Sequence, residues 1–131
     1  MPNTRTPTGF ALLIRTDGQF RLIDWPANDA DHLKILYAAC DADHIDAVRI
    51  TDALTMWLDD EGMINEAGPN LGATRLYALH RQPHQLYYGH ALFTGGADAD
   101  GNTLGLTSDE AAHLVEMHLT AGRTPTQRTG N

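Results

Sequence analysis

The chain has 131 residues, about the size of one ordinary domain, with 42% hydrophobic and 20% charged residues. Its apolar runs, such as residues 10–14, are far shorter than the ~20 residues that a membrane-spanning helix needs, and the N-terminus does not resemble a signal peptide. We therefore expect a cytoplasmic protein that contacts no membrane. The single cysteine, Cys40, excludes an internal disulfide and a cysteine-based zinc site.

The charge is strongly negative, with seventeen acidic and nine basic residues and a net charge of −8. Residues 24–66 alone carry −9, and the rest of the chain carries +1. Phosphate contacts need a basic surface, so we expect no direct binding of nucleic acid. Solubility explains such an acidic segment, and the alternative is a face for a basic partner that includes Asp59, Asp60 and Glu61.

Residues 10–15 and 20–25 are two short runs of aliphatic and aromatic residues. An Asp-Gly pair between such runs, here Asp17 and Gly18, is typical of a tight hairpin because both turn residues must tolerate positive φ. The sequence therefore predicts an antiparallel hairpin at the start of the domain.

A helix is expected next, capped by Asn28 or Asp29, whose side chains can accept bonds from the first helical N–H groups. Apolar residues then recur with the spacing i, i+3, i+4, i+7, at Leu33, Leu36, Tyr37 and Cys40. This spacing predicts that one helical face packs on the sheet.

Further strands are predicted over residues 45–51, 54–58 and 86–94, with a glycine inside the last one. Residues 73–79 fit either a helix or a strand, and we favour a helix. Residues 98–102, Asp-Ala-Asp-Gly-Asn, match no calcium-loop register and indicate a turn.

The last helix is predicted to begin with a capping box formed by Thr107 and Glu110 and to end at Gly122. Its spacing assigns a buried side to Ala111, Leu114, Val115, His118 and Leu119.

These elements predict an α+β fold, a single domain over residues 10–121 in which a mostly antiparallel, twisted sheet is packed against two helices. The Thr-, Pro- and Gly-rich ends, residues 1–9 and 122–131, are expected to be disordered tails. The residues expected to be largely buried are Leu12, Ile14, Ile23, Leu33, Leu36, Val48, Ile50, Trp57, Leu92, Leu114 and Val115.

No motif in the chain indicates catalysis. His80 and His84 have helical spacing but are separated by Pro83, there is no GxSxG motif, and Cys40 lies on the predicted apolar stripe. The sequence therefore favours a protein that is not an enzyme and predicts neither a metal site nor a cofactor.

A candidate ligand site lies in the long loop over residues 65–74 and the strand near it. Asn70 and Thr74 offer hydrogen bonds, Arg75 offers a fork of donors for a carboxylate or phosphate, and Gly89 beside His90 leaves room for a ligand. The structural alternative is that Asn70 only caps the helix that follows it.

Three segments carry a resemblance to a known family: residues 70–77, Asn-Leu-Gly-Ala-Thr-Arg-Leu-Tyr; residues 88–95, Tyr-Gly-His-Ala-Leu-Phe-Thr-Gly; and residues 106–110, Leu-Thr-Ser-Asp-Glu. With the hairpin and the acidic turn at residues 59–62 in matching order, the chain resembles the family known as domain of unknown function 3846. The resemblance implies a small protein of phages, plasmids or integrated elements, with no catalytic residues to carry over.

We therefore expect a non-catalytic binding or accessory protein of a mobile genetic element, which acts through an unidentified protein or small ligand. One alternative is a sponge or hydrolase for a nucleotide signal that counteracts host defence. Another is an acidic DNA mimic that inhibits a basic host protein.

Overall fold

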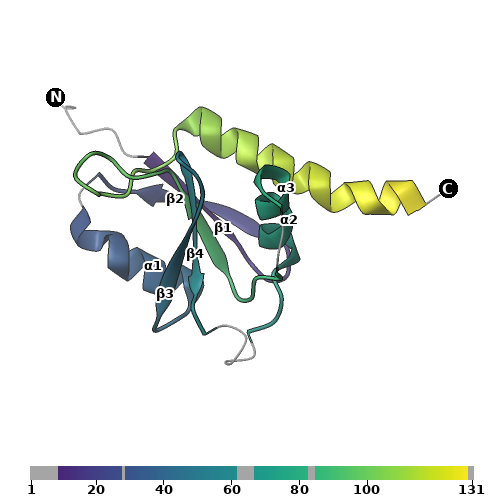
Figure 1. The fold of residues 1–131 in the computed structure, drawn as a ribbon, viewed down its shortest axis with the longest axis horizontal. Coiled ribbons are helices and arrows are strands. Elements are labelled where there is room, and N and C mark those ends of the chain that lie inside the picture. Colours follow the sequence, from purple (N-terminus) through teal and green to yellow (C-terminus); the bar gives the residue numbers. More distant parts are fainter. Residues whose placement is uncertain (1–8, 28, 62–66, 83–84, 130–131) are drawn as a thin grey trace.

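The computed structural model describes residues 9–27, 29–61, 67–82 and 85–129 and places them in one five-stranded antiparallel sheet with helices on both faces (Figure 1). The strands are ordered β2-β1-β5-β4-β3. Their bounds, with those of the helices, are β1 Gly9–Ile14, β2 Phe20–Trp25, η1 Asp29–Asp31, α1 His32–Cys40, β3 Ile45–Thr51, β4 Leu54–Asp59, α2 Leu71–His80, β5 Ala91–Thr94 and α3 Ser108–Thr129. The predicted α+β class and antiparallel sheet are confirmed.

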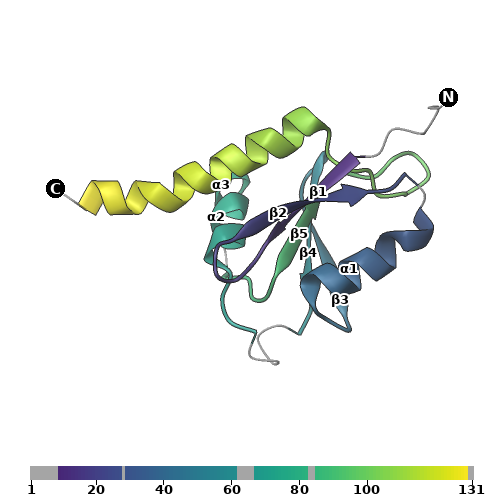
Figure 2. The ribbon, with the colours of Figure 1, turned by 180° about the vertical axis from the view of Figure 1, so that it is seen from behind.

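Both faces of the sheet are covered, with α1 on one side and α2 with α3 on the other (Figures 1 and 2). Successive side chains of a strand point to opposite faces. In β1, Leu12 and Ile14 therefore join the core under α2 and α3, and Ala11 and Leu13 join the core under α1. Burial on two sides explains why β1 is a continuous apolar run rather than an alternating one.

The first hairpin forms at the predicted place, with Ile14 opposite Phe20, but its turn has three residues, 16–18, instead of the two expected. Gly18 has a φ of +89°, and the Arg15 N–H donates to the Gln19 carbonyl at 2.9 Å. The carboxylate of Asp17 accepts the Gln19 N–H at 3.0 Å. This turn fixes the register in which the side chains of β1 and β2 face each other.

The predicted buried face of α1 is confirmed in part. Leu36 and Cys40 are buried as predicted, whereas Leu33 is 55% exposed and Tyr37 is 40% exposed. The buried position at the start of the helix belongs to His32, a polar residue four residues before Leu36 that an apolar pattern does not include.

His32 defines the observed face of α1, since its ring stacks on Trp25 at a centroid distance of 4.1 Å and bonds the Pro26 carbonyl at 2.7 Å. Of the two predicted caps, Asp29 lies in η1 and Asn28 lies outside the described residues. The residue at the helix start is Asp31, whose side chain makes no capping bond.

The hairpin of β3 and β4 and the helix α2 agree with the sequence, but β5 is shorter than the predicted strand. Gly89 has a φ of +86°, and Tyr88 pairs with Pro69 in an isolated bridge. Residues 86–90 therefore follow the start of α2 instead of extending the sheet.

The capping box of α3 is confirmed, because the Thr107 N–H donates to the Glu110 carboxylate at 2.9 Å and the Glu110 N–H donates to the Thr107 hydroxyl at 3.1 Å. Two other expectations for this helix are wrong. Leu119 is 47% exposed, and Gly122 does not end the helix, which continues to Thr129. A glycine inside a helix costs only about 1 kcal/mol relative to alanine, so it need not act as a stop.

Among the described residues, no helix is both long enough and apolar enough to cross a membrane. The disorder predicted for residues 1–9 and 122–131 in solution stays a prediction.

Most of the predicted core is buried. Leu12, Ile14, Leu36, Ile50, Leu92 and Leu114 are buried, and Ile23, Val48, Trp57 and Val115 are partly buried. Leu33 is the exception, for the reason given above.

Two matched substitutions test which side of α1 is buried. Leu36→Ala removes a side chain that is 3% exposed and should lower the free energy of unfolding by ~2–5 kcal/mol. Leu33→Ala removes an exposed side chain and should change it by less than ~0.5 kcal/mol. Urea denaturation measures both values, and equal losses would contradict the observed face.

Candidate functional site

Asn70 is fully buried and lies at the N-cap of α2. Its side-chain oxygen accepts the Ala73 N–H at 3.0 Å, which confirms the capping alternative. Its side-chain nitrogen donates to the carbonyl oxygens of Ile14 and Gly89, both at 2.8 Å. The amide therefore joins the start of α2 to the end of β1 and to the segment before β5, with both donors and its oxygen engaged.

Thr74 and Gly89 belong to the same cluster. The Thr74 hydroxyl donates to the Asn70 carbonyl at 2.9 Å and accepts the Tyr87 N–H at 3.1 Å. The Gly89 N–H donates to the Gly68 carbonyl at 2.9 Å, and the positive φ of Gly89 requires glycine. The structure thus brings Asn70, Thr74 and Gly89 together through contacts that stabilise the fold.

Arg75 is not joined to this cluster by a hydrogen bond. It lies half-buried on α2, and within the described part of the chain its buried Nε atom has no hydrogen-bond partner. The ligand role predicted for these residues stays a prediction.

His90 faces a different place from the Asn70 cluster. Its Nδ1 atom accepts the backbone N–H of Thr16 at 3.2 Å, so the neutral ring carries its proton on Nε2. Burial lowers the pKa of His90 below its usual value, and the nearby Arg15 guanidinium lowers it further. Asp41 and Asp17 oppose this shift more weakly. His90 is therefore a neutral hydrogen-bond donor at neutral pH.

His90 lines an open groove of about 480 Å³ between α1 and the hairpin of β1 and β2. The other lining residues are Leu13, Arg15, Arg21, Ile23, Ile35, Ala38, Ala39 and Asp41. The β1–β2 hairpin supplies Arg15 from its turn, Arg21 from β2 and part of an apolar floor, and α1 supplies the opposite wall. A volume of this size is within the range of small-molecule sites.

Arg15 and Arg21 give the groove its chemical character. Both side chains are exposed, and among the described residues neither guanidinium forms a hydrogen bond or an ion pair. Asp41 contributes one carboxylate, from the left-handed position that ends α1. The groove therefore combines two unpaired cations, one imidazole donor and one acceptor above an apolar floor, which suits an anionic ligand.

Sequence reasoning missed Arg15 and Arg21 as site residues. The expected two-residue Asp17-Gly18 turn would pair residue 15 with residue 20 and put the two arginines on opposite faces of the hairpin. The observed turn is one residue longer and pairs Ile14 with Phe20, so Arg15 and Arg21 lie on one face with Leu13 and Ile23.

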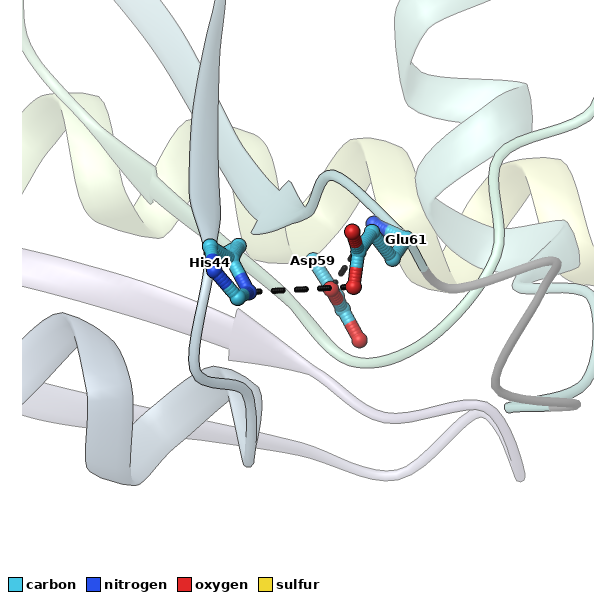
Figure 3. Close-up of polar contacts among 3 residues, drawn as sticks. All are labelled: His44, Asp59 and Glu61. Carbon is cyan, nitrogen blue, oxygen red and sulfur yellow. Dashed lines mark hydrogen bonds and ion pairs between the residues drawn. The ribbon is translucent and has the colours of Figure 1, made fainter.

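The predicted acidic face is divided by burial. Asp59 is 6% exposed and accepts the Glu61 N–H at 2.8 Å. Glu61 is half-exposed and points toward His44 (Figure 3), and its carboxylate lies 3.7 Å from Nδ1 of that ring. Asp60 is exposed and donates its N–H to the His44 carbonyl at 3.0 Å. Only Asp60 and Glu61 of this trio present charge to solvent.

Cys40 is a core residue, as predicted. It is 3% exposed, and its thiol donates to the Trp57 carbonyl at 3.4 Å. Burial raises the pKa of Cys40 to about 12, so it is a thiol rather than a nucleophilic thiolate at neutral pH. Among the residues that the structure describes, no group of three or more His, Cys, Asp or Glu side chains is placed to hold a metal ion.

Comparison with known proteins identifies the family. Residues 8–119 match the sequence profile described as Domain of unknown function (DUF3846), which confirms the resemblance seen in the sequence. No curated protein and no solved structure matches the chain significantly.

The structural role of Asn70 predicts a large loss of stability in Asn70→Ala. Loss of the cap costs about 1 kcal/mol, and each buried carbonyl left without a donor costs ~1–3 kcal/mol. We expect a total loss of at least ~3 kcal/mol in urea denaturation. Asn70→Asp keeps the capping oxygen but loses both donors, so it should also be strongly destabilised. Wild-type stability of Asn70→Asp would show that the cap alone matters.

The pKa of His90 tests the contact with Arg15. Titration followed by NMR of the histidine rings should give a His90 pKa below 6.5, the usual value, in the wild type. Arg15→Gln removes a neighbouring positive charge, so the pKa of His90 should rise. Arg49→Gln, which removes the same charge outside the groove, should leave it unchanged. An unchanged His90 pKa in Arg15→Gln would place Arg15 too far away to act on the ring.

Proposed function

Since the chain belongs to the DUF3846 family, we propose that it is a non-catalytic binding protein of a mobile genetic element that acts by holding a small ligand in the groove of Arg15, Arg21 and His90. The observation that supports this proposal is the pair of guanidinium groups that make no hydrogen bond or ion pair with the described residues. An arginine fork is the side chain best suited to planar, bidentate recognition of carboxylate or phosphate.

The charge balance of the chain strengthens the proposal. Seventeen carboxylates are available in this protein, yet among the described residues none lies within ion-pair distance of Arg15 or Arg21. Arginines that only kept the protein soluble would have no reason to share a face with His90 above an apolar floor. Their common face and the groove beside them favour a ligand from solution.

Binding accounts for the groove better than catalysis does. The neutral imidazole of His90 is held by the Thr16 N–H and is placed to donate rather than to accept. The thiol of Cys40 is buried in the core and protonated. A nucleotide-signal sponge is one form of this proposal, whereas a hydrolase would need an activated nucleophile in addition.

The alternative of an acidic DNA mimic keeps some support from the described residues. A mimic needs exposed carboxylates, and most described acidic residues of the segment 24–66 are exposed, although Asp59 is buried. Asp60 and Glu61 remain available for a basic partner.

The proposal predicts that a small molecule accompanies the protein purified from its native host. Native mass spectrometry should detect it on the wild type, and Arg15→Gln with Arg21→Gln should lose it because both charge-assisted contacts are gone. Arg49→Gln is the matched control and should keep it.

Two results would contradict the proposal. One is a copurifying small molecule that the double variant retains, which would locate binding elsewhere. The other is a copurifying basic protein that is released by Asp60→Lys with Glu61→Lys but not by the arginine variants. That result would favour the acidic face as the functional surface.

A further inference from the structure

We infer that the ligand of this groove is a small organic anion with one phosphate or carboxylate group, an apolar or planar body and at least one hydrogen-bond donor. This inference rests on the proposed function and adds the chemical class of the ligand. Each of the three parts follows from a different set of lining residues.

The anionic group is assigned to the two arginines. Arg15 lies opposite Gln19 in the hairpin, and Arg21 lies opposite Leu13. Arg15 and Arg21 are thus diagonal neighbours across the strand pair, with backbones ~7–8 Å apart, which long side chains can span. Both guanidinium groups can therefore reach one anionic group placed between them.

The body of the ligand is assigned to the apolar floor. Leu13 and Ile23 rise from the strands, and Ile35 with two alanines, Ala38 and Ala39, forms the facing side of α1. Small side chains on the helix leave space above this floor. An inorganic anion would leave this apolar surface in water, whereas an organic body would bury it and gain ~25 cal/mol per Å² of apolar area.

Asp41 determines two properties of the ligand, its hydrogen-bond donor and its single anionic group. Its carboxylate can only accept, so the ligand group beside it must carry an N–H or O–H. The same carboxylate repels a second anionic group, and the net charge of −8 repels any polyanion. The groove should therefore prefer one anionic group to a polyphosphate chain. His90 adds a donor from Nε2 for a neutral acceptor of the ligand.

The test uses defined probes and the ring resonances of His90 as the reporter. Adenosine 5′-monophosphate represents organic phosphates, and N-acetylphenylalanine represents organic carboxylates. Inorganic phosphate lacks the body, adenosine lacks the anion, and adenosine triphosphate carries extra charge. Titrations followed by NMR on the full chain give the Kd of each probe.

We expect at least one of the two organic anions to shift the His90 resonances and to bind about tenfold tighter than inorganic phosphate, which lacks the apolar body, and than adenosine, which lacks the anion. Whichever of these two probes binds more tightly tells whether the preferred anionic group is a phosphate or a carboxylate. The triphosphate should bind more weakly than the monophosphate. Arg21→Gln should weaken binding about tenfold, and Arg49→Gln should not.

The inference is overturned if inorganic phosphate binds as tightly as both organic anions, or if adenosine or the triphosphate binds best. If Arg21→Gln weakens that binding, the proposed function stands and only the ligand class is wrong; if it does not, the proposed function fails as well. If no probe shifts His90 and no small molecule accompanies the purified protein, the ligand class and the proposed function fail together. An acidic peptide that shifts His90 when all five probes fail would also overturn the inference.

Discussion

The side-chain amide of Asn70 holds together the parts of the chain that build the groove. It donates to the carbonyl of Ile14, the residue before Arg15, and to the carbonyl of Gly89, the residue before His90. Two segments that are far apart in sequence are thereby fixed side by side, and the Thr16 N–H completes the link by bonding His90. A buried amide whose two donors and oxygen are all engaged is rigid, so it fixes the segments that carry Arg15 and His90 without lining the groove itself.

Local signals account for what the sequence predicted correctly. The Asp17-Gly18 turn, the pairing of residues 45–51 with 54–58 and the capping box at Thr107 each depend on a few adjacent residues. The errors have causes outside such windows. His32 lies on the buried side of α1 because it stacks on Trp25 and bonds the Pro26 carbonyl, and Tyr88 pairs with Pro69 outside the sheet. Tertiary contacts of this kind leave no periodic pattern in the sequence.

The sequence indicated some residues of the candidate site and missed others, because tertiary contacts decide which side chains meet. The long loop before α2 pointed to Asn70, Gly89 and His90, and the structure does join these residues through hydrogen bonds and chain connectivity. Their roles differ, however, because Asn70 is a buried cap and His90 lines the groove on the other face of the sheet. Arg15 and Arg21 become site residues only when the register of the hairpin is combined with the position of α1, and the sequence alone does not place that helix.

His90 connects the groove to the stability of the fold. Because folding lowers its pKa, the unfolded chain binds more protons than the folded chain around and below pH 6.5. Its contribution to stability is therefore present above that pH and is lost as the pH falls through the folded pKa. Protonation of Nδ1 would also break the bond from the Thr16 N–H, which lies next to Arg15. An anion held by Arg15 offsets the positive charge that lowers the His90 pKa, so occupancy of the groove and protonation of the ring are thermodynamically linked.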